Sequence, residues 1–298
     1  MTNFRIIQTR NIWLTISGVL FIVFLAALLL WGFKYGIDFT GGSLLEVKFN
    51  QARPQVTEAE SSLAGLKLSS LIIQPVGDID MILRFQETSE DTHQAVLAKL
   101  NQLAGSGGLE ELRFDSVGPS IGAELKRKAI YAIFFVLIAI LFYITYAFRK
   151  VSKPIASWKY GSAAIIAMFH DAIITMGVFA VLGKFYGVEI NTPFVAAILT
   201  VIGYSVHDTI VVFDRIRENL PRSDEDFEGT VNLSLNQTMV RSINTSLTVI
   251  FVLLAIIIFG GSSIRTFALA LTVGIFIGTY SSIFVASPLL VIWEKFRK

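Results

Sequence analysis

Six long apolar segments constrain this sequence more than any other feature. The first, residues 12–32, contains no charged residue and follows Arg5 and Arg10. A spanning helix needs about 20 apolar residues, whereas the core of a signal peptide has about 7–15. We therefore expect an uncleaved first spanning helix. Five more segments of this kind follow, at residues 129–148, 160–182, 193–213, 241–259 and 264–293.

The composition is typical of a polytopic α-helical membrane protein. Of the 298 residues, 53% are hydrophobic and 16% are charged, and the mean hydropathy is +0.64. A soluble protein carries more charge, about 25% of its residues. The absence of cysteine excludes disulfides, a thiolate nucleophile and cysteine-ligated metals. The net charge of +2 gives no indication of nucleic-acid binding.

Residues 34–125 differ in composition and predict a water-soluble domain between the first two spans. They contain thirteen acidic and seven basic residues, a net charge of −6. Alternating apolar residues predict strands, and amphipathic runs predict two helices, the first capped by Thr57. The expected elements are strand 43–49, helix 56–66, strands 68–76 and 81–86, helix 88–105 and strand 111–118. This βαββαβ order is that of a ferredoxin-like α+β domain.

The positions of the basic residues predict which side of the membrane each part faces. Six spans place both termini on one side, together with Arg5, Arg10 and the basic stretch at 149–159. Because basic residues are enriched in cytoplasmic loops, we expect cytoplasmic termini. The predicted divisions are the N-terminus with the first span (1–33), an extracytoplasmic domain (34–125) and the bundle of spans two to six (126–298).

Two acidic residues lie within predicted spans, where a carboxylate is costly and marks a candidate functional site. Asp208 lies roughly 22 Å beyond Pro193 along the fourth span, and Asp171 falls near the middle of the third. Arg241 opens the fifth span at a similar depth, so we expect it beside Asp208. Such a carboxylate can carry a proton, with Arg241 as its partner and Asp171 as a further member. A static ion pair between Asp208 and Arg241 is an alternative of equal weight.

Two His-Asp doublets, at 170–171 and 207–208, raise the alternative of a metal site. Adjacent residues point about 100° apart on a helix, so one doublet cannot direct both side chains to one point. No third strong ligand is evident, and we expect neither a metal nor a cofactor. His170 and His207 are interpreted as packing residues or minor members of a proton path. An intramembrane serine protease would need a serine within reach of a histidine base, whereas Ser205 and His207 lie only two residues apart on one helix.

Two stretches carry a specific resemblance to a known family. The first is YGIDFTGGS (35–43), directly after the first span. The second is VIGYSVHDTIVVFDRIREN (201–219), with Asn236, Gln237 and Arg241 following it. Together with GTYSSIFVASPLL (278–290), they are similar to the SecF family of bacterial protein-export membrane subunits, in the RND superfamily. The resemblance runs from the first span to the last.

The resemblance implies a protein-translocation subunit of the bacterial inner membrane, not an enzyme. It implies a separate SecD, the SecYEG channel and a translocating preprotein as partners, and protons as the driving ion. The resemblance also suggests YajC and membrane lipids as further partners. Asp208 and Arg241 match the family's membrane acid and arginine, whereas many members have Asn in place of His207. The other motif residues, with a structural or coupling role, are Gly36, Asp38, Gly41, Gly42, Gly203, Tyr204, Asp214 and Arg215.

Two other functions fit part of this pattern. An RND-type half-transporter for lipids or small amphiphiles would share the spans and the buried acids, although GIDFTGG argues against it. A non-pumping scaffold that stabilises SecD and the channel would use Asp208 and Arg241 as a static pair. We expect the SecF-type function.

Overall fold

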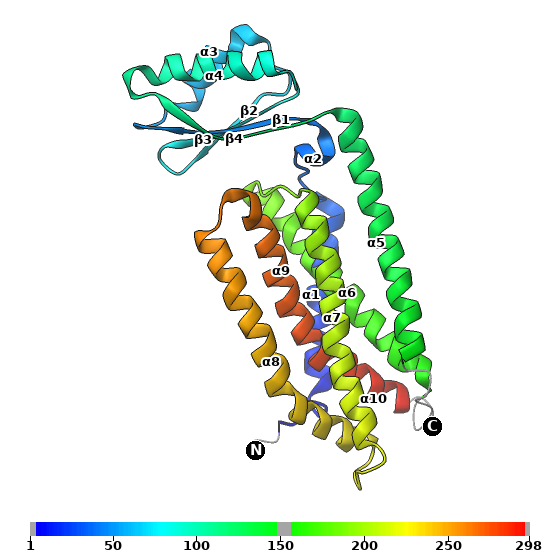
Figure 1. Ribbon diagram of the computed structural model, residues 1–298. Coiled ribbons are helices and arrows are strands. Elements are labelled where there is room, and N and C mark those ends of the chain that lie inside the picture. The colour runs from blue at the N-terminus through cyan, green and yellow to red at the C-terminus, as the bar shows by residue number, and fades with distance from the viewer. Residues whose placement is uncertain (1–3, 148–155, 296–298) are drawn as a thin grey trace. The chain divides into compact units, whose positions relative to one another are not determined.

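The computed structural model describes residues 4–147 and 156–295, and the chain forms two compact units. A helical unit contains residues 1–34 and 131–298, and an α+β unit contains residues 35–130 (Figure 1). Six stretches of the described chain are long and apolar enough to span a membrane. They are α1 (Arg10–Trp31), α5 (Pro119–Ala147), α6 (Ser157–Tyr186), α7 (Thr192–Asn219), α8 (Phe227–Phe259) and the continuous run of α9 (Ser262–Ser281), η3 (Ser282–Ala286) and α10 (Ser287–Lys295). The predicted architecture is confirmed.

Two spanning helices begin well before their apolar segments. α5 begins at Pro119 rather than at residue 129, and α8 begins at Phe227 rather than at residue 241. Proline is favoured in the first turn of a helix because that turn needs no donor from it. The side chain of Asp226 caps α8 by accepting a hydrogen bond from the Gly229 N–H at 2.8 Å. Apolar composition therefore located the membrane part of each helix but not its polar extension.

α7 lies at the centre of the helical unit and packs against α6, α8 and α9. Val201 and Ile202 are fully buried on this helix. Two glycines of α9 allow it to approach α7 closely: a Cβ at Gly278 would lie 3.3 Å from the Ser205 Cβ, and one at Gly274 would overlap the Val201 side chain. Small residues at such crossings allow backbones to pack tightly in membranes.

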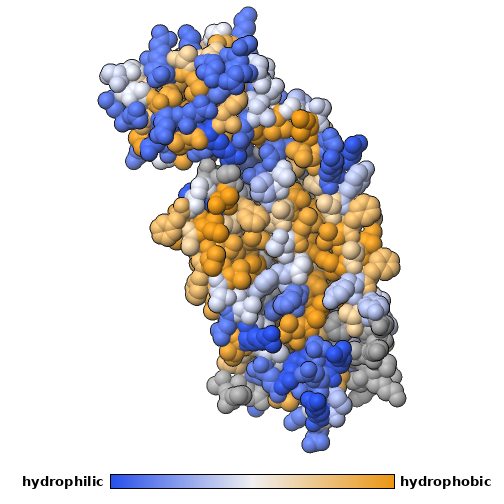
Figure 2. All heavy atoms as spheres, in the orientation of Figure 1, coloured by the Kyte–Doolittle hydropathy of each residue, from blue (hydrophilic) through white to orange (hydrophobic). Residues whose placement is uncertain are grey.

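The outer faces of α1, α5 and α8 expose large apolar side chains. Examples are Ile22, Leu29, Phe135, Phe142, Phe251 and Ile258. Figure 2 shows hydrophobic residues covering much of the helical unit and hydrophilic residues gathered at one of its ends. An exposed apolar surface of this kind is expected where helices contact lipid.

The α+β unit is a four-stranded antiparallel sheet in the order β2-β3-β1-β4. Its strands are β1 (Gly42–Phe49), β2 (Ile72–Val76), β3 (Asp80–Phe85) and β4 (Leu109–Val117). Both helices, α3 (Val56–Leu63) and α4 (Glu90–Ala104), cover the same face of the sheet (Figure 1). Leu45 of β1 lies opposite Leu83 of β3 and Phe114 of β4, and the two leucines belong to the buried core. The predicted βαββαβ order is confirmed.

Two local predictions in this unit were wrong. The cap of α3 is Gln55, whose side chain forms a capping box with Glu58, and not Thr57. The strand predicted at 68–76 begins only at Ile72, because Lys67 and Ser70 adopt positive φ angles and the chain turns there. The Ser69 N–H also donates to both carboxylate oxygens of Glu87, at 2.9 and 3.1 Å. Burial raises the pKa of Glu87, but the hydrogen bonds from Ser69 outweigh it and the pKa lies below its usual value.

The glycine pair of the GIDFTGG motif makes the turn from α2 (Ile37–Thr40) into β1. Gly41 has φ +75°, and a Cβ there would lie 2.7 Å from the Cα of Pro119. Gly42 has φ +107°, and a Cβ there would lie 2.6 Å from the carbonyl oxygen of Phe85. Only glycine fits both the backbone angles and the space at these positions. This geometry supports the structural role of the motif.

Replacing Gly42 with alanine is expected to destabilise the α+β unit. Holding a residue with a Cβ at unfavourable backbone angles costs about 1–3 kcal/mol, and the overlap with Phe85 adds to that cost. The measurement is the protease resistance of this unit in the full chain inserted in membranes. Gly118→Ala is the matched control, since a Cβ there meets no atom within 4 Å. Equal resistance of the two variants would show that the turn tolerates a side chain.

Candidate functional site: a buried acid cluster

Asp171 lies on α6 at the centre of the helical unit and is completely buried. Its Oδ2 accepts hydrogen bonds from Ser205 Oγ of α7 at 2.5 Å and from Ser281 Oγ of α9 at 2.6 Å. Its Oδ1 lies 2.9 Å from the Nδ1 of His170, the preceding residue. One carboxylate therefore connects three spanning helices through short polar contacts.

Asp208 lies on α7, and its carboxylate is also buried. Its Oδ2 accepts a hydrogen bond from Ser282 Oγ at 2.7 Å. Ser282 follows Ser281 directly, so two adjacent serines of the last span bind the two acids on α6 and α7. The chain changes from α-helix to π-helix at this point, in η3, and π-helical turns are frequent at functional sites. Neither serine was singled out from the sequence, although a serine pair in the middle of an apolar span was a readable signal.

Hydroxyl groups, and not cations, surround both acids. Among the described residues, neither Asp171 nor Asp208 has a lysine or arginine within ion-pair distance. No group of three or more His, Asp or Glu side chains suited to a metal ion occurs in the described part of the chain. A buried carboxylate that is held by hydroxyl donors is free to change its protonation state without breaking an ion pair.

The sequence predicts that Arg241 lies beside Asp208, but the structure does not bring the two residues together. Arg241 is exposed on α8, and in the described residues it forms no ion pair. The buried face of α8 carries Thr238, Ser242 and Ser246 instead. Arg241 precedes Ser242 and so points about 100° away from that face. The estimate of depth along the helix said nothing about the direction of the side chain.

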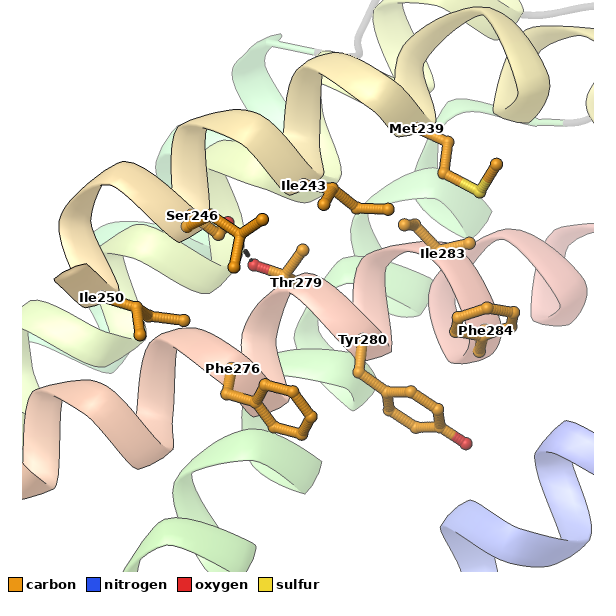
Figure 3. A pocket seen from close by; sticks show the side chains of 10 residues that line it. Met239, Ile243, Ser246, Ile250, Phe276, Thr279, Tyr280, Ile283 and Phe284 are labelled. Atoms are coloured by element: carbon orange, nitrogen blue, oxygen red, sulfur yellow. Dashed lines mark hydrogen bonds between the residues drawn. The ribbon is translucent and has the colours of Figure 1, made fainter.

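Tyr204 belongs to a chain of hydroxyl groups that joins three helices. Its OH lies 3.0 Å from Ser246 Oγ of α8, which lies 2.5 Å from Thr279 Oγ1 of α9. Figure 3 shows this last bond at the side of an apolar hollow of about 240 Å³ between α8 and the last span. The hydroxyls tie α7, α8 and α9 together next to the acid cluster.

Asp214 and Arg215 lie at the end of α7, away from the acid cluster. Asp214 forms an exposed ion pair with Arg217 on the same helix, at 2.6 Å. Arg215 donates to Gln237 Oε1 of α8 at 2.6 Å, and Asn219 donates to the same oxygen at 2.8 Å. This part of the motif joins the ends of α7 and α8.

Polar and small residues line open faces of α7 and α8. On α7 the exposed positions include Ala196, Thr200, Gly203 and His207, and a Cβ at Gly203 would meet no atom within 4 Å. On α8 they include Arg241, Asn244, Thr245 and Thr248. Polar side chains facing lipid are costly, so these faces differ from the apolar outer faces of α1 and α5.

Carboxylates that are buried among spanning helices and bound by hydroxyl groups are typical of membrane transport proteins. Two family models match the chain: "Protein export membrane protein SecD/SecF, C-terminal" over residues 96–296, and "SecD/SecF GG Motif" over residues 32–52. The chain belongs to the SecD/SecF family, and within it to the SecF type of translocase subunit. It is a transport protein and not an enzyme.

Relatives and solved structures match over nearly the whole chain. The SecF translocase subunit of Thermobaculum terrenum is 47% identical over 97% of this chain and 94% of the relative, and that of Synechocystis is 38% identical over 96% and 92%. The crystal structure of SecDF, a translocon-associated membrane protein from Thermus thermophilus, has a TM-score of 0.83 and 34% identity over 99% of this chain. This chain spans 39% of that SecDF chain. A second SecDF structure, in a super-membrane-facing form, has a TM-score of 0.70 and 33% identity, covering 100% of this chain and 39% of its own.

Proposed function

We propose that this chain pairs with a separate SecD subunit and uses proton flow to assist preproteins that emerge from the SecYEG channel. The acid cluster is the observation that carries the proposal. Asp171 and Asp208 are buried in the membrane part, are held by serine hydroxyls and lack a cationic partner among the described residues. Proton-coupled transporters place such acids inside their bundles, because a proton that moves to or from a site within the membrane crosses part of the membrane potential.

The open polar faces of α7 and α8 support a SecD partner. The chain spans 39% of the SecDF chain that it resembles, which leaves room for a second half of similar design. A helical partner against Gly203 and His207 would remove polar groups from lipid, and Arg241 would then lie inside a subunit interface. In this arrangement Arg241 could pair with an acid of the partner or reach Asp208 after a movement of α8.

The proposed topology places the protein in the bacterial inner membrane, with both termini in the cytoplasm and the α+β unit outside. The basic residues Arg5 and Arg10 support it by the positive-inside bias. The α+β unit would then meet preproteins on the side where they leave the channel. YajC remains a further partner of the proposal.

The test is preprotein export in cells that can be depleted of this chain, measured before and after the proton gradient is dissipated. We expect the chain to accelerate export, and we expect this advantage to disappear without the gradient. Dividing the export rate of cells with the chain by that of cells without it removes any effect of the gradient on the channel itself. A scaffold would keep its advantage after the gradient is lost. A lipid transporter would alter the lipid distribution of the membrane while export continued normally.

A further inference from the structure

A cavity of about 480 Å³ lies beside the acid cluster, between α1, α6 and the last span. Most of its lining is apolar, and the exceptions are Ser17 and His170. Ser17 Oγ is already hydrogen bonded to the Tyr280 hydroxyl, at 3.0 Å. The other lining residues are Leu14, Gly18, Phe21, Ile166, Phe169, Val285 and Leu289.

His170 connects this cavity to Asp171. Its side chain is 6% exposed, and its Nδ1 lies 2.9 Å from Asp171 Oδ1. Its Nε2 is buried and has no hydrogen-bond partner among the described residues. Unpaired buried nitrogens are rare in folded proteins, and a functional role or a transient water is the usual explanation. The imidazole ring thus has one nitrogen bound to the acid and one nitrogen unused, in a side chain that forms part of the cavity wall.

The His170 ring contacts one aromatic side chain and one carboxylate among the described residues. From α1 it meets Phe21, whose ring lies 6.3 Å away and nearly parallel, at 9°. Asp171 is the charged group in contact with it, and Asp171 is held in turn by Ser205 and Ser281. Asp208 is the next titratable group, bound by Ser282. Tyr280 lies beyond Ser17.

We propose that His170 relays protons between water in this cavity and Asp171, an inference that rests on the proton-coupled function proposed above. In one transfer, Asp171 gives its proton from Oδ1 to the Nδ1 of His170, and His170 releases its proton from Nε2 to a water molecule. The products are an ionised Asp171, a neutral imidazole protonated at Nδ1, and a protonated water, so protons and charge balance. A further transfer in the same direction requires the His170 ring to turn, and the adjacent cavity provides the space.

The position of the cavity indicates which side of the membrane the relay serves. Leu14 lies near the start of α1 and Leu289 lies in α10, so the cavity occupies the half of the helical unit in which α1 begins and α10 ends (Figure 1). With the termini in the cytoplasm, His170 serves the side on which protons leave. The histidine contacts Oδ1 of Asp171, whereas Ser281 donates to Oδ2 of the same acid and Ser282 donates to Asp208.

The test uses the complex of this chain with its SecD partner in lipid vesicles, under an imposed pH gradient, with a trapped pH-sensitive dye. His170→Ala is expected to slow proton transfer about 100-fold, the lower end of what a positioned proton-transfer group contributes. Added imidazole is expected to restore the rate by entering the cavity beside the shortened side chain. Pyrrole, which has the same shape but no basic nitrogen, is expected to leave it slow. Ile166→Ala is the matched control, because Ile166 lines the same cavity on α6 but carries no group that binds a proton, and it is expected to keep the wild-type rate.

Three outcomes would overturn this inference. The first is a wild-type rate for His170→Ala, and the second is equal rescue by pyrrole, which would assign His170 a space-filling role. The third is slow transfer that imidazole does not restore in a variant that assembles normally. An Asp208→Asn variant distinguishes failure of the His170 relay from failure of the proposed proton-coupled function. If Asp208→Asn is slow while His170→Ala is fast, only the relay fails, whereas wild-type rates for both variants contradict the proton-coupled function.

Discussion

Asp208→Asn is expected to lower preprotein export to the level of cells that lack this chain. Asparagine has nearly the volume of aspartate and offers an oxygen to Ser282 Oγ, which now donates to the carboxylate at 2.7 Å. It cannot take up or release a proton. The variant should therefore fold and assemble but lose the proton uptake and release that the buried carboxylate provides.

The measurement is the rate of preprotein export by pulse-labelling, with the membrane levels of this chain and of SecD followed in the same cells. Asp214→Asn is the matched control. It makes the same chemical change on the same helix, but Asp214 lies exposed beside Arg217, and export should stay normal. Normal export by Asp208→Asn would make this residue a packing group and would move the coupling role to Asp171 or to the partner subunit. Loss of the chain from the membrane would instead indicate a structural role.

Much of the architecture could be read from the sequence because hydrophobic periodicity and length decide it. Apolar runs of about 20 residues have one stable environment, which is a bilayer. Alternation and amphipathic spacing predicted the βαββαβ order of the α+β unit. The ends of the helices were harder, since the polar start of α8 at Phe227 is helical through its Asp226 cap and through contacts with other elements. Asn232 and Asn236, for example, accept hydrogen bonds from the backbone of Ile7 and Phe4.

The site was predicted in part, and the missing part has a geometric reason. Asp171 and Asp208 were recognised because a carboxylate in an apolar span is rare and costly. Arg241 was placed beside Asp208 from its depth alone, whereas the rotation of α8 decides which residues face the centre, and Ser242 and Ser246 do. Ser281 and Ser282 were not identified because serine is common in packed membrane helices. Only the three-dimensional crossing of α6, α7 and α9 shows that these hydroxyls bind the acids.

The acid cluster depends on how closely α9 approaches α7, which makes Gly274 a sensitive position. A Cβ at Gly274 would lie 2.6 Å from Val201 Cγ1 and 2.9 Å from Val201 Cβ, well inside van der Waals contact. Gly278, one turn further, faces Ser205, the residue that binds Asp171. Ser281 and Ser282 follow on the same span. Any side chain at Gly274 therefore moves Ser281 and Ser282 away from the two acids that they bind.

Gly274→Leu is expected to destabilise the helical unit by about 3 kcal/mol or more, at the upper end of the cost of overpacking. Leucine needs space that the fully buried Val201 occupies, and the three atoms nearest to a Cβ at Gly274 all belong to Val201. The measurement is the thermal midpoint of unfolding of the detergent-solubilised chain, read from the fraction that remains monodisperse. Gly18→Leu is the matched control. A Cβ at Gly18 of α1 meets no atom within 4 Å, and the same side chain there should leave the midpoint unchanged.

The double variant Gly274→Leu with Val201→Ala distinguishes a direct clash from a general intolerance of bulk on α9. Removing the valine methyls opens space where leucine needs it, so the second change should recover stability that the first removed. Residues in contact give such non-additive effects, often of about 0.5–3 kcal/mol. If the two substitutions only add, α9 does not pack on α7 through Gly274. The positions of Ser281 and Ser282 against the two acids would then need another cause, because it is this crossing that brings them together.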